Sequence, residues 1–591
     1  MSQPRALLPL WVKAVYGAPS FAGAAIAIPI LIHMPKFYSD VVLVPVGWIA
    51  MAIAIARALD AITDPAIGWL SDRTESRLGR RRPWIALGAP ICALALVALF
   101  SPPTSLTPSQ AGMWFTATFA LYFLFHAIYE IPYQGLGFEL SPDYRDRSSL
   151  FAWRMAFIIV GTVVASIAPA VLAGAGVADP RVQMHWIALA FGAALIGLFG
   201  LLVASVGERR EIGGRVSNPL VPGVRRALRN RPFRILFLTF VIGSLPSAIP
   251  ALMLPFFISY VIQPEHPEQI LGFFLLLYFG SSFLFLPLWV WAANRFGKLQ
   301  AWLASFGIGI SAGIALFFAG QGDVLYVALL HVWAGVAFGA GGLLVPSMQA
   351  DVVDYDELHT GKRREAQFAA FWAIVPKFVA IPGAALPIAA LAAIGYVPNQ
   401  VQTPEVQLGI RVIYAITPAV FGIASFFLAR LYPISESIHA GIKLGIAAHL
   451  RGESVPDPLT GEPLAPPASR AIDESTGWFL DYFSPRELAR LAQGESQRLV
   501  RGVTQKLALC AGLTLVFFTI AARALGSLDT EPGLTPVMCV VFGGFALTGT
   551  CFHALRLRRA REMQASPVAP ELVRLHLAGI SSGETRLARA A

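Results

Sequence analysis

Residues 42–85 read VLVPVGWIAMAIAIARALDAITDPAIGWLSDRTESRLGRRRPWI, and this stretch decides the fold class. It opens with an apolar run of about 20 residues, the length that an α-helix needs to cross a bilayer. Arg57, Asp60 and Asp64 interrupt or border that run, and a glycine-bearing turn rich in arginine follows it. A second apolar run begins at Trp84. The stretch therefore predicts two membrane helices joined by a basic loop, the first of them carrying charges.

Similar apolar runs recur along the chain. Of its 591 residues, 56% are hydrophobic and 14% are charged, and the mean hydropathy is +0.63, whereas soluble chains are about one quarter charged. We expect 12 spans followed by two extra ones, which makes the fold class an all-α polytopic membrane protein. The expected spans lie near 11–34, 42–63, 84–101, 111–133, 151–174, 184–205, 233–261, 270–292, 300–319, 325–348, 367–395, 409–431, 504–524 and 535–558.

Basic residues are concentrated in every second loop. The loop 206–234 alone holds eight arginines, whereas the loops on the other side hold Lys36, Arg181 and little else. Because cytoplasmic loops carry the Lys/Arg excess, we expect both termini to be cytoplasmic, in a plasma or inner membrane. Each basic cluster adjoins a span, so the net charge of +10 does not indicate a nucleic-acid partner.

The order of spans and loops divides the chain into six expected parts. These are two six-helix halves (1–205 and 233–435), a cytoplasmic basic loop (206–232), a cytoplasmic linker with a short helix (436–503), two extra helices (504–558) and a cytoplasmic tail (559–591). A short basic turn after the second span has a counterpart at 293–298 after the eighth, which supports the two halves.

The region after the second half has its own signals. The proline-rich run 455–467 predicts a disordered linker. Ser484, followed by Pro485 and by Glu487, predicts a capped helix start. We expect residues 436–591 to pack against the two halves or against a protein partner.

Charges inside the predicted spans mark candidate functional residues, because a charge at the bilayer centre costs at least ~2.5 kcal/mol. Arg57, Asp60 and Asp64 fall on one helix face, with Thr63 beside them. Two carboxylates on one face can bind a hard cation such as Na⁺ or hold a proton on one acid. The alternative is a structural ion-pair cluster around Arg57.

Three other spans contribute charges. Glu130 follows His126 and precedes Tyr133 and Gln134, a pattern that indicates a cavity-lining face, although a helix end facing solvent would look the same. Arg154 could bind a substrate anion or hydroxyl, or extend its side chain to the membrane surface.

Lys377 lies deep in the eleventh span. A lysine there requires a carboxylate partner, for which Asp60, Asp64 or Glu130 would serve. The alternative is a purely structural tether.

Three stretches resemble one transporter family. They are DAITDPAIGWLSDRTESRLGRRRPWI (60–85), EIPYQGL (130–136) and ADVVDYDELHTGKRRE (350–365). They are similar to the signatures of the melibiose-permease group, the glycoside–pentoside–hexuronide:cation symporters of the major facilitator superfamily. The resemblance covers residues 9–440 and implies the major facilitator fold of two six-helix halves.

The resemblance also implies residue roles. It places the cation site at Asp60, Asp64, Glu130 and Thr63. It places Lys377 close to that site, and we add Arg57 to it as the coupling charge pair. It places substrate binding at Arg154, to which we add Tyr133, Gln134, His126 and Trp372. It makes the loop after the second span a cytoplasmic latch, with Gly68, Asp72, Arg73, Arg80 and Arg81.

This chain departs from the sugar-binding members at three positions. It has Ala24 where they have an acidic residue, Gln134 where they have a sugar-stacking tryptophan, and Ala127 where they have a threonine cation ligand. The chain is also similar to the animal sodium-dependent lysophosphatidylcholine symporters, which share the DAITDP motif and an apolar first helix. A lipid or other amphiphile is therefore an alternative substrate.

The sequence thus predicts a secondary active transporter and not an enzyme. We expect symport of a small organic solute, a glycoside or sugar-like compound, coupled to Na⁺ or H⁺ by alternating access. The alternatives are a symporter of a lysophospholipid or another amphiphile, and a non-transporting receptor or regulator with the same fold. The expected partners are the substrate and membrane lipids, with no cofactor beyond the coupling ion and no metal beyond Na⁺ at Asp60 and Asp64.

Overall fold

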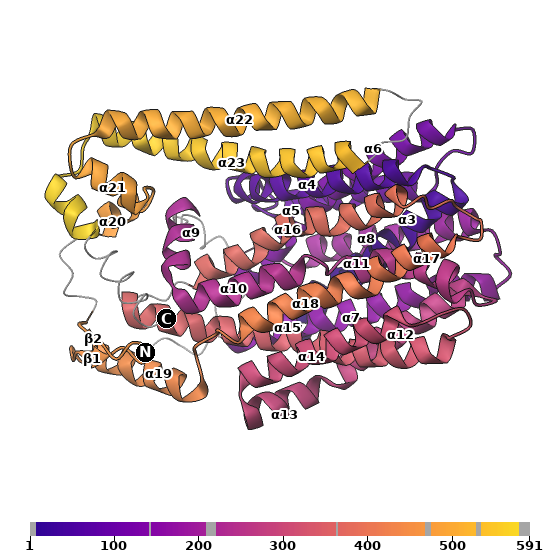
Figure 1. Ribbon diagram of the computed structural model, residues 1–591, viewed down its shortest axis with the longest axis horizontal. Coiled ribbons are helices and arrows are strands. Elements are labelled where there is room, and N and C mark those ends of the chain that lie inside the picture. Colours follow the sequence, from indigo (N-terminus) through magenta and orange to yellow (C-terminus); the bar gives the residue numbers. More distant parts are fainter. Residues whose placement is uncertain are drawn as a thin grey trace.

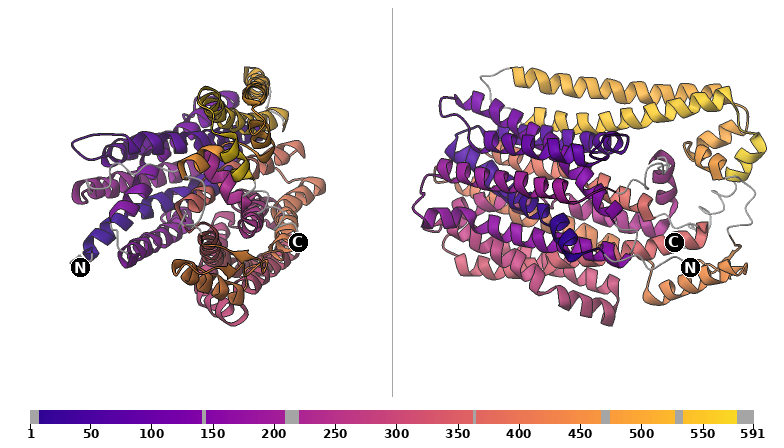
Figure 2. Two further views of the ribbon diagram at one scale, coloured as in Figure 1. Left: turned by 90° about the vertical axis from the view of Figure 1, so that its left-hand side faces the viewer. Right: turned by 180° about the vertical axis from the view of Figure 1, so that it is seen from behind.

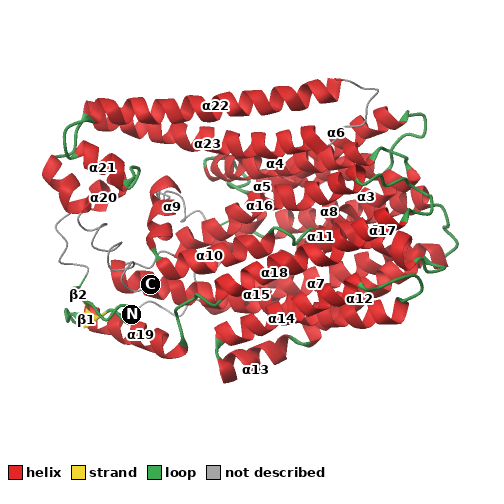
Figure 3. Ribbon diagram, viewed as in Figure 1, coloured by secondary structure: helices red, strands yellow, loops and turns green. Residues whose placement is uncertain are grey.

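The computed structural model describes residues 8–140, 144–208, 220–361, 365–466, 474–526 and 534–577. These residues are almost wholly helical (Figures 1 and 3). Long helices run side by side along one axis, and short helices gather beyond one end of the bundle (Figure 2). We call this the appendage end, because it carries the helices α19, α20 and α21, and we name the opposite end after Asp40.

The first half holds six long helical segments. The first is built from α1 (Leu10–Gly17), α2 (Pro19–Ile28), the π-helical turn η1 (Pro29–His33), α3 (Met34–Lys36) and a second π-helical turn, η2 (Phe37–Val41). It is followed by α4 (Val46–Asp72), α5 (Arg82–Phe100), α6 (Pro108–Leu140), α7 (Tyr144–Gly174) and α8 (Pro180–Ser205).

The second half repeats this order. It opens with α9 (Leu220–Arg229), α10 (Arg231–Ser244), α11 (Ile249–Phe257) and the π-helical turn η4 (Ile258–Ile262), followed by α12 (Pro267–Leu284) and α13 (Leu286–Phe296). It continues with α14 (Lys298–Phe317), α15 (Val324–Thr360), α16 (Glu365–Ala393), α17 (Pro404–Arg411), η5 (Val412–Ile416) and α18 (Thr417–Ala429).

The remaining elements form the appendage. They are α19 (Glu436–Leu450), the strands β1 (Val455–Pro456) and β2 (Pro463–Leu464), α20 (Glu474–Leu480), α21 (Pro485–Leu491), α22 (Ser496–Gly526) and α23 (Leu534–Ala565). The long helices α22 and α23 lie together along one side of the bundle (Figure 1).

Within the described residues, 12 helices are long and apolar enough to cross a membrane, and α22 and α23 are among them. The helices α4 and α16 have 27 and 29 residues and include side chains outside the described part of the chain. Both are packed inside the bundle against each other, where charges can be compensated by neighbouring helices.

Small residues let helices from different parts of the chain approach closely. At Gly161 of α7, an added Cβ would lie 2.3 Å from the carbonyl oxygen of Phe21 in α2. Only glycine allows that approach, which sets α7 directly beside the first span. The two halves meet along two seams, one between α4 and α16 and the other between α7 and α12.

The proline-rich run 455–467 corrects one expectation. Its described part, up to residue 466, is no disordered linker: β1 and β2 pair antiparallel, Val455 opposite Leu464. Asp457 closes the turn, since its backbone N–H donates to the carbonyl of Glu462 at 2.7 Å and its carboxylate accepts from Tyr355 of α15 at 3.1 Å. The composition signalled disorder, but docking on α15 orders the segment.

The predicted capped helix start is confirmed. The Ser484 hydroxyl accepts from the backbone N–H of Glu487, and the Glu487 carboxylate accepts from the backbone N–H of Ser484 at 2.8 Å. This reciprocal arrangement begins α21, with Pro485 in its first turn.

Candidate functional site

The charged face of α4 lies inside the bundle. Asp60 and Asp64 are 9% and 8% exposed. The Nη1 of Arg57 lies 3.9 Å from the Oδ2 of Asp60, and its guanidinium lies 4.6 Å from the centre of the Phe123 ring in α6. The hydroxyl of Thr63 donates to the backbone carbonyl of Asp60 at 3.5 Å, so in this state it bonds to its own helix.

A second polar cluster joins α6, α7 and the first span. The Nη2 of Arg154 and the Nε2 of Gln134 both donate to the Oε1 of Glu130, each at 2.8 Å. The Nε of Arg154 donates to the hydroxyl of Ser20 at 3.1 Å. Three helices therefore share one network of charged and neutral hydrogen bonds, in which Arg154 and Glu130 remain partly exposed and Ser20 is buried.

The network extends through Tyr133. Its hydroxyl donates to the carbonyl of Tyr16 at 2.6 Å and therefore accepts from Ser20 at 2.8 Å. The guanidinium of Arg154 lies 5.0 Å from the centre of the Tyr133 ring. Sequence reasoning had named Tyr133 and Arg154 but missed Ser20 and Tyr16, which carry no charge and lie in an apolar run.

The two clusters are neighbours. The helices α4 and α6 pack directly against each other, and Tyr122 of α6 is near enough to Arg57, Asp60 and Glu130 for their charges to act on it. His126 stands one helical turn along, with its ring centre 5.9 Å from that of Tyr122. It belongs to a ladder of aromatic rings along α6 rather than to the hydrogen-bond network described above.

The expected residues of α16 are placed less completely. Trp372 stacks on Phe240 of α10, with ring centres 5.0 Å apart, and also contacts Phe237. Lys377 lies in the helical backbone of α16, which packs along α4, but its side chain is outside what the structure describes. Its pairing with the carboxylates of α4 and α6 stays a prediction.

The latch loop between α4 and α5 is organised by a residue that sequence reasoning missed. The carboxylate of Glu208, just beyond α8, accepts the backbone N–H groups of Arg80, Arg81 and Arg82 at 2.7, 2.8 and 2.7 Å. Gly79 makes room for it, because its φ is +108° and an added Cβ would lie 2.7 Å from the carboxyl carbon. A carboxylate at the start of α5 also complements the helix dipole.

The other latch residues lie in the last turns of α4 and in the loop that follows it. The guanidinium of Arg81 lies against Gly135 of α6, where a Cβ would be 2.1 Å from its Nη1. Gly68 faces Ile131 of α6, and Arg73 is exposed. The side chain of Asp72 is outside the described residues.

At the Asp40 end, a buried acid joins the two halves. The carboxylate of Asp40 accepts from the hydroxyls of Tyr260 and Tyr396, each at 2.6 Å. The side chain of Asn399 donates to the Asp40 carbonyl at 2.6 Å, and Lys36 lies 3.1 Å from the carboxylate. We call these five residues the Asp40 lock. The sequence signal was faint: one acid at the end of the first apolar run.

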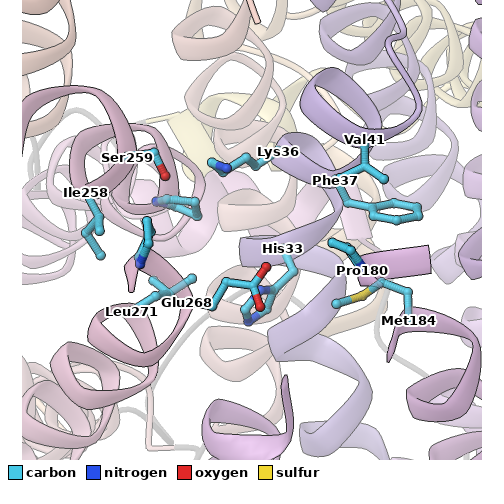
Figure 4. Close-up of a pocket in the computed structure, with 12 residues that line it drawn as sticks. His33, Lys36, Phe37, Val41, Pro180, Met184, Ile258, Ser259, Glu268 and Leu271 are labelled. Carbon is cyan, nitrogen blue, oxygen red and sulfur yellow. The ribbon is translucent and has the colours of Figure 1, made fainter. Parts of the chain in front are cut away.

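A small cavity lies next to the lock. Its volume is about 60 Å³, and it is bordered by His33 and Lys36 from the first half and by Ser259 and Glu268 from the second (Figure 4). Polar groups of both halves therefore meet in the plane where the bundle is closed.

The bundle of two six-helix halves is the architecture of major facilitator transporters. The solved nucleoside transporter NupG has the same fold, with a TM-score of 0.52 and 16% identity over 71% of this chain and 99% of that one.

The family model described as MFS/sugar transport protein matches residues 15–436, and the chain belongs to this family. The Escherichia coli protein YagG, whose name describes a glycoside/cation symporter, is 24% identical over 72% of this chain and 92% of that protein. The zebrafish sodium-dependent lysophosphatidylcholine symporter 1-A is 26% identical over 73% of this chain and 86% of that protein. The chain is thus an integral membrane transporter and not an enzyme, as its sequence indicated.

Proposed function

We propose that the protein is a secondary active symporter that couples uptake of a small hydroxyl-rich solute, a glycoside or a similar compound, to entry of Na⁺ or H⁺. The single observation that carries this proposal is the adjacency of two polar clusters inside the bundle. One holds the carboxylates of α4, and the other holds Glu130, Arg154, Gln134 and Ser20.

The α4 cluster is suited to a cation. It combines two buried carboxylates with one guanidinium that lies 3.9 Å from Asp60. Two acids with one base leave a net negative charge, which a bound Na⁺, a proton or Lys377 would balance. In our proposal Lys377 balances this charge in the empty state, and an entering cation displaces it.

The second cluster is suited to hydroxyl groups. Arg154 and Gln134 are donors, Glu130 is an acceptor, and Ser20 is both, all within one hydrogen-bonded network. The substrate would replace bonds that these side chains now make with each other. In our proposal a cation at α4 strengthens substrate binding in the adjacent cluster, and the substrate strengthens cation binding by the same factor.

The proposed orientation places the appendage end in the cytoplasm. The basic loops after the second, sixth and eighth spans meet at that end, and cytoplasmic loops carry the Lys/Arg excess. The Asp40 end would then face outward from the plasma or inner membrane, closed by its lock.

An amphiphile is the second candidate substrate. The residues that favour it are Ala24 and Gln134, which stand where sugar-binding members carry an acid and a tryptophan. The similarity to the lysophosphatidylcholine symporter of zebrafish points the same way.

The experiment is the thermal stability of the purified protein with and without Na⁺ at two pH values, across glycosides and lysolipids. A ligand that binds the folded state raises the melting temperature, because at 100 times its Kd it adds ~2.7 kcal/mol to the free energy of unfolding. A Na⁺-dependent shift with glycosides supports the first proposal, and a shift with lysolipids alone supports the second. If no ligand shifts the protein and no gradient drives uptake in proteoliposomes, the non-transporting alternative is favoured.

A further inference from the structure

The helix α23 lies across the seam between the two halves. It packs against α4 of the first half and α16 of the second. At Gly544, an added Cβ would lie 3.6 Å from the Cβ of Ala58 in α4 and 3.9 Å from the Cδ1 of Ile381 in α16. One residue of α23 thus faces both halves at once.

The two helices of the hairpin are buried very differently. The early part of α23 belongs to the main hydrophobic core, where Val537, Val540 and Val541 are each at most 2% exposed. By contrast, α22 lies outside α23 and packs chiefly on it (Figure 1), for example through Thr514, 3.3 Å from Thr550. Of the two hairpin helices, α23 makes the extensive contacts with the seam helices α4 and α16, and α22 lies on the outer side of α23.

A cluster of short helices anchors this hairpin at the appendage end. Asp481, which follows α20 and is 0% exposed, pairs with Arg226 and with Arg229 of α9, the latter at 2.8 Å. His576 lies 3.0 Å from the same carboxylate. The guanidinium of Arg226 also lies 3.8 Å from the centre of the Trp478 ring. The appendage is therefore fixed to α9, which leads directly into the second half.

A second ion pair holds the cluster to α23. Arg556 of α23 pairs with Glu487 of α21, and Lys506 of α22 lies 3.3 Å from the same carboxylate. Burial opposes ionisation of Glu487, but its bonds with the Ser484 backbone and with Arg556 outweigh that effect and lower its pKa to about 2. Apolar side chains, among them Leu480 and Phe483, fill the space between these elements.

We propose that α20 to α23 form a clamp that stabilises the state in which the Asp40 lock is closed. Opening the bundle at the Asp40 end requires α4 and α16 to move apart, because they belong to different halves. The contacts that α23 makes with both helices are lost in that motion, and Asp481 and Glu487 keep the hairpin in place. The clamp thereby slows the exchange between the two states and sets the rate of transport.

The test measures opening directly and needs no substrate, so it stands or fails separately from the proposed transport reaction. The variant Gly544→Leu places a large side chain between α23 and the two seam helices. Its matched control is Gly512→Leu on α22, where an added Cβ meets nothing within 4 Å. Hydrogen exchange of the full chain in nanodiscs is read in peptides covering 258–262 and 396–399, which carry the lock, and in α14 as reference.

We expect Gly544→Leu to raise the hydrogen-exchange rate of the lock peptides by about threefold or more and to leave the rate of α14 unchanged. Gly512→Leu should change neither of these two rates. Faster exchange in α23 with an unchanged lock would overturn the proposal, because the appendage would then be passive. A uniform rise that includes α14 would also overturn it, since it reports general loosening.

A second variant covers the case in which Gly544→Leu does not fold. Asp481→Asn keeps the size of the side chain but removes the charge that holds α9, and Glu453→Gln in the exposed Arg451–Glu453 pair is its control. Asp481→Asn should speed exchange in α20 and, to a smaller extent, at the lock. An unchanged or lower hydrogen-exchange rate of the lock peptides in Asp481→Asn would overturn the proposal of a clamp.

Discussion

Two buried aspartates of this molecule are surrounded very differently. Asp481, in the appendage, is 0% exposed and is met by Arg226, Arg229 and His576. Asp60, in α4, is 9% exposed, and its described ion pair is the single contact with Arg57 at 3.9 Å.

The difference separates an acid that holds structure from one that can exchange partners. A buried carboxylate is stable when cations and hydrogen-bond donors compensate its charge fully, as they do for Asp481. Among the described side chains, Asp60 has one ion-pair partner at 3.9 Å, an arrangement that suits the ion exchange we propose for this site. Incomplete pairing of a membrane-buried charge is thus a more useful signal of function than its burial alone.

The largest expected effect tests this contrast at Asp60. Asp60→Asn should lower gradient-driven uptake by about 100-fold, the upper range of coupling between two ligands, because the cation site loses a charge. The melting temperature should change little, since the carboxylate is weakly compensated. Uptake assays in proteoliposomes and thermal melts measure the two effects. Intact uptake in Asp60→Asn would remove α4 from the coupling site.

The next effect concerns the Asp40 lock. Asp40→Asn keeps the shape but replaces charge-assisted hydrogen bonds from Tyr260 and Tyr396 with neutral ones, a loss of about 1.4 kcal/mol, or tenfold in the closed-to-open ratio. Hydrogen exchange at 258–262 measures that ratio. The control Glu265→Gln, an exposed acid close to the lock in sequence, should have no effect. Equal hydrogen-exchange rates at 258–262 in Asp40→Asn and Glu265→Gln would show that the Asp40 lock does not hold the two halves together.

A smaller effect is expected at the latch loop. Glu208→Gln weakens three hydrogen bonds from the backbone of Arg80 to Arg82 and should lower the free energy of unfolding by about 1–2 kcal/mol. Thermal melts measure the change, with Glu75→Gln, an exposed acid of the same loop, as control. If Glu208→Gln and the wild type have the same melting temperature, the Glu208 carboxylate does not organise the loop.

The smallest effect is a pH dependence at Asp481. Burial raises its pKa, but the bond from His576 and the charges of Arg229 and Arg226 outweigh burial and lower the pKa to about 2, below its ordinary value of 3.8. The stabilisation is therefore complete above pH 3.8 and is lost as the pH falls through 2. Pepsin cleavage between α20 and α21 should increase over this range in the wild type. In Asp481→Asn the cleavage rate should already be high at pH 4. If the wild type and Asp481→Asn show the same pH dependence of cleavage, the Asp481 carboxylate does not stabilise this region.

Local and periodic features were predictable from the sequence. Apolar runs predicted the spans, and the spacing of Ser484 and Glu487 predicted a cap that is present. The three charges of α4 could be assigned to one face because a helix brings residues three and four apart together.

Contacts between distant segments were not predictable. Glu208 meets a loop more than 120 residues earlier in the chain, and Asp40 meets Tyr396 across 356 residues. Nothing in the neighbourhood of either residue identifies its partner. The hairpin at 455–464 was missed because proline content describes the isolated chain and not its docking on α15.

The position of α22 and α23 at the end of the sequence has a consequence for biogenesis. Membrane helices emerge from the ribosome in order, and chains grow at roughly 5–20 residues per second. Every helix of the two halves is complete before α22 begins at Ser496. A newly made molecule therefore passes through an interval of several seconds in which both halves have been synthesised but the proposed clamp has not, and in our proposal a hairpin made after both halves controls how the finished protein opens.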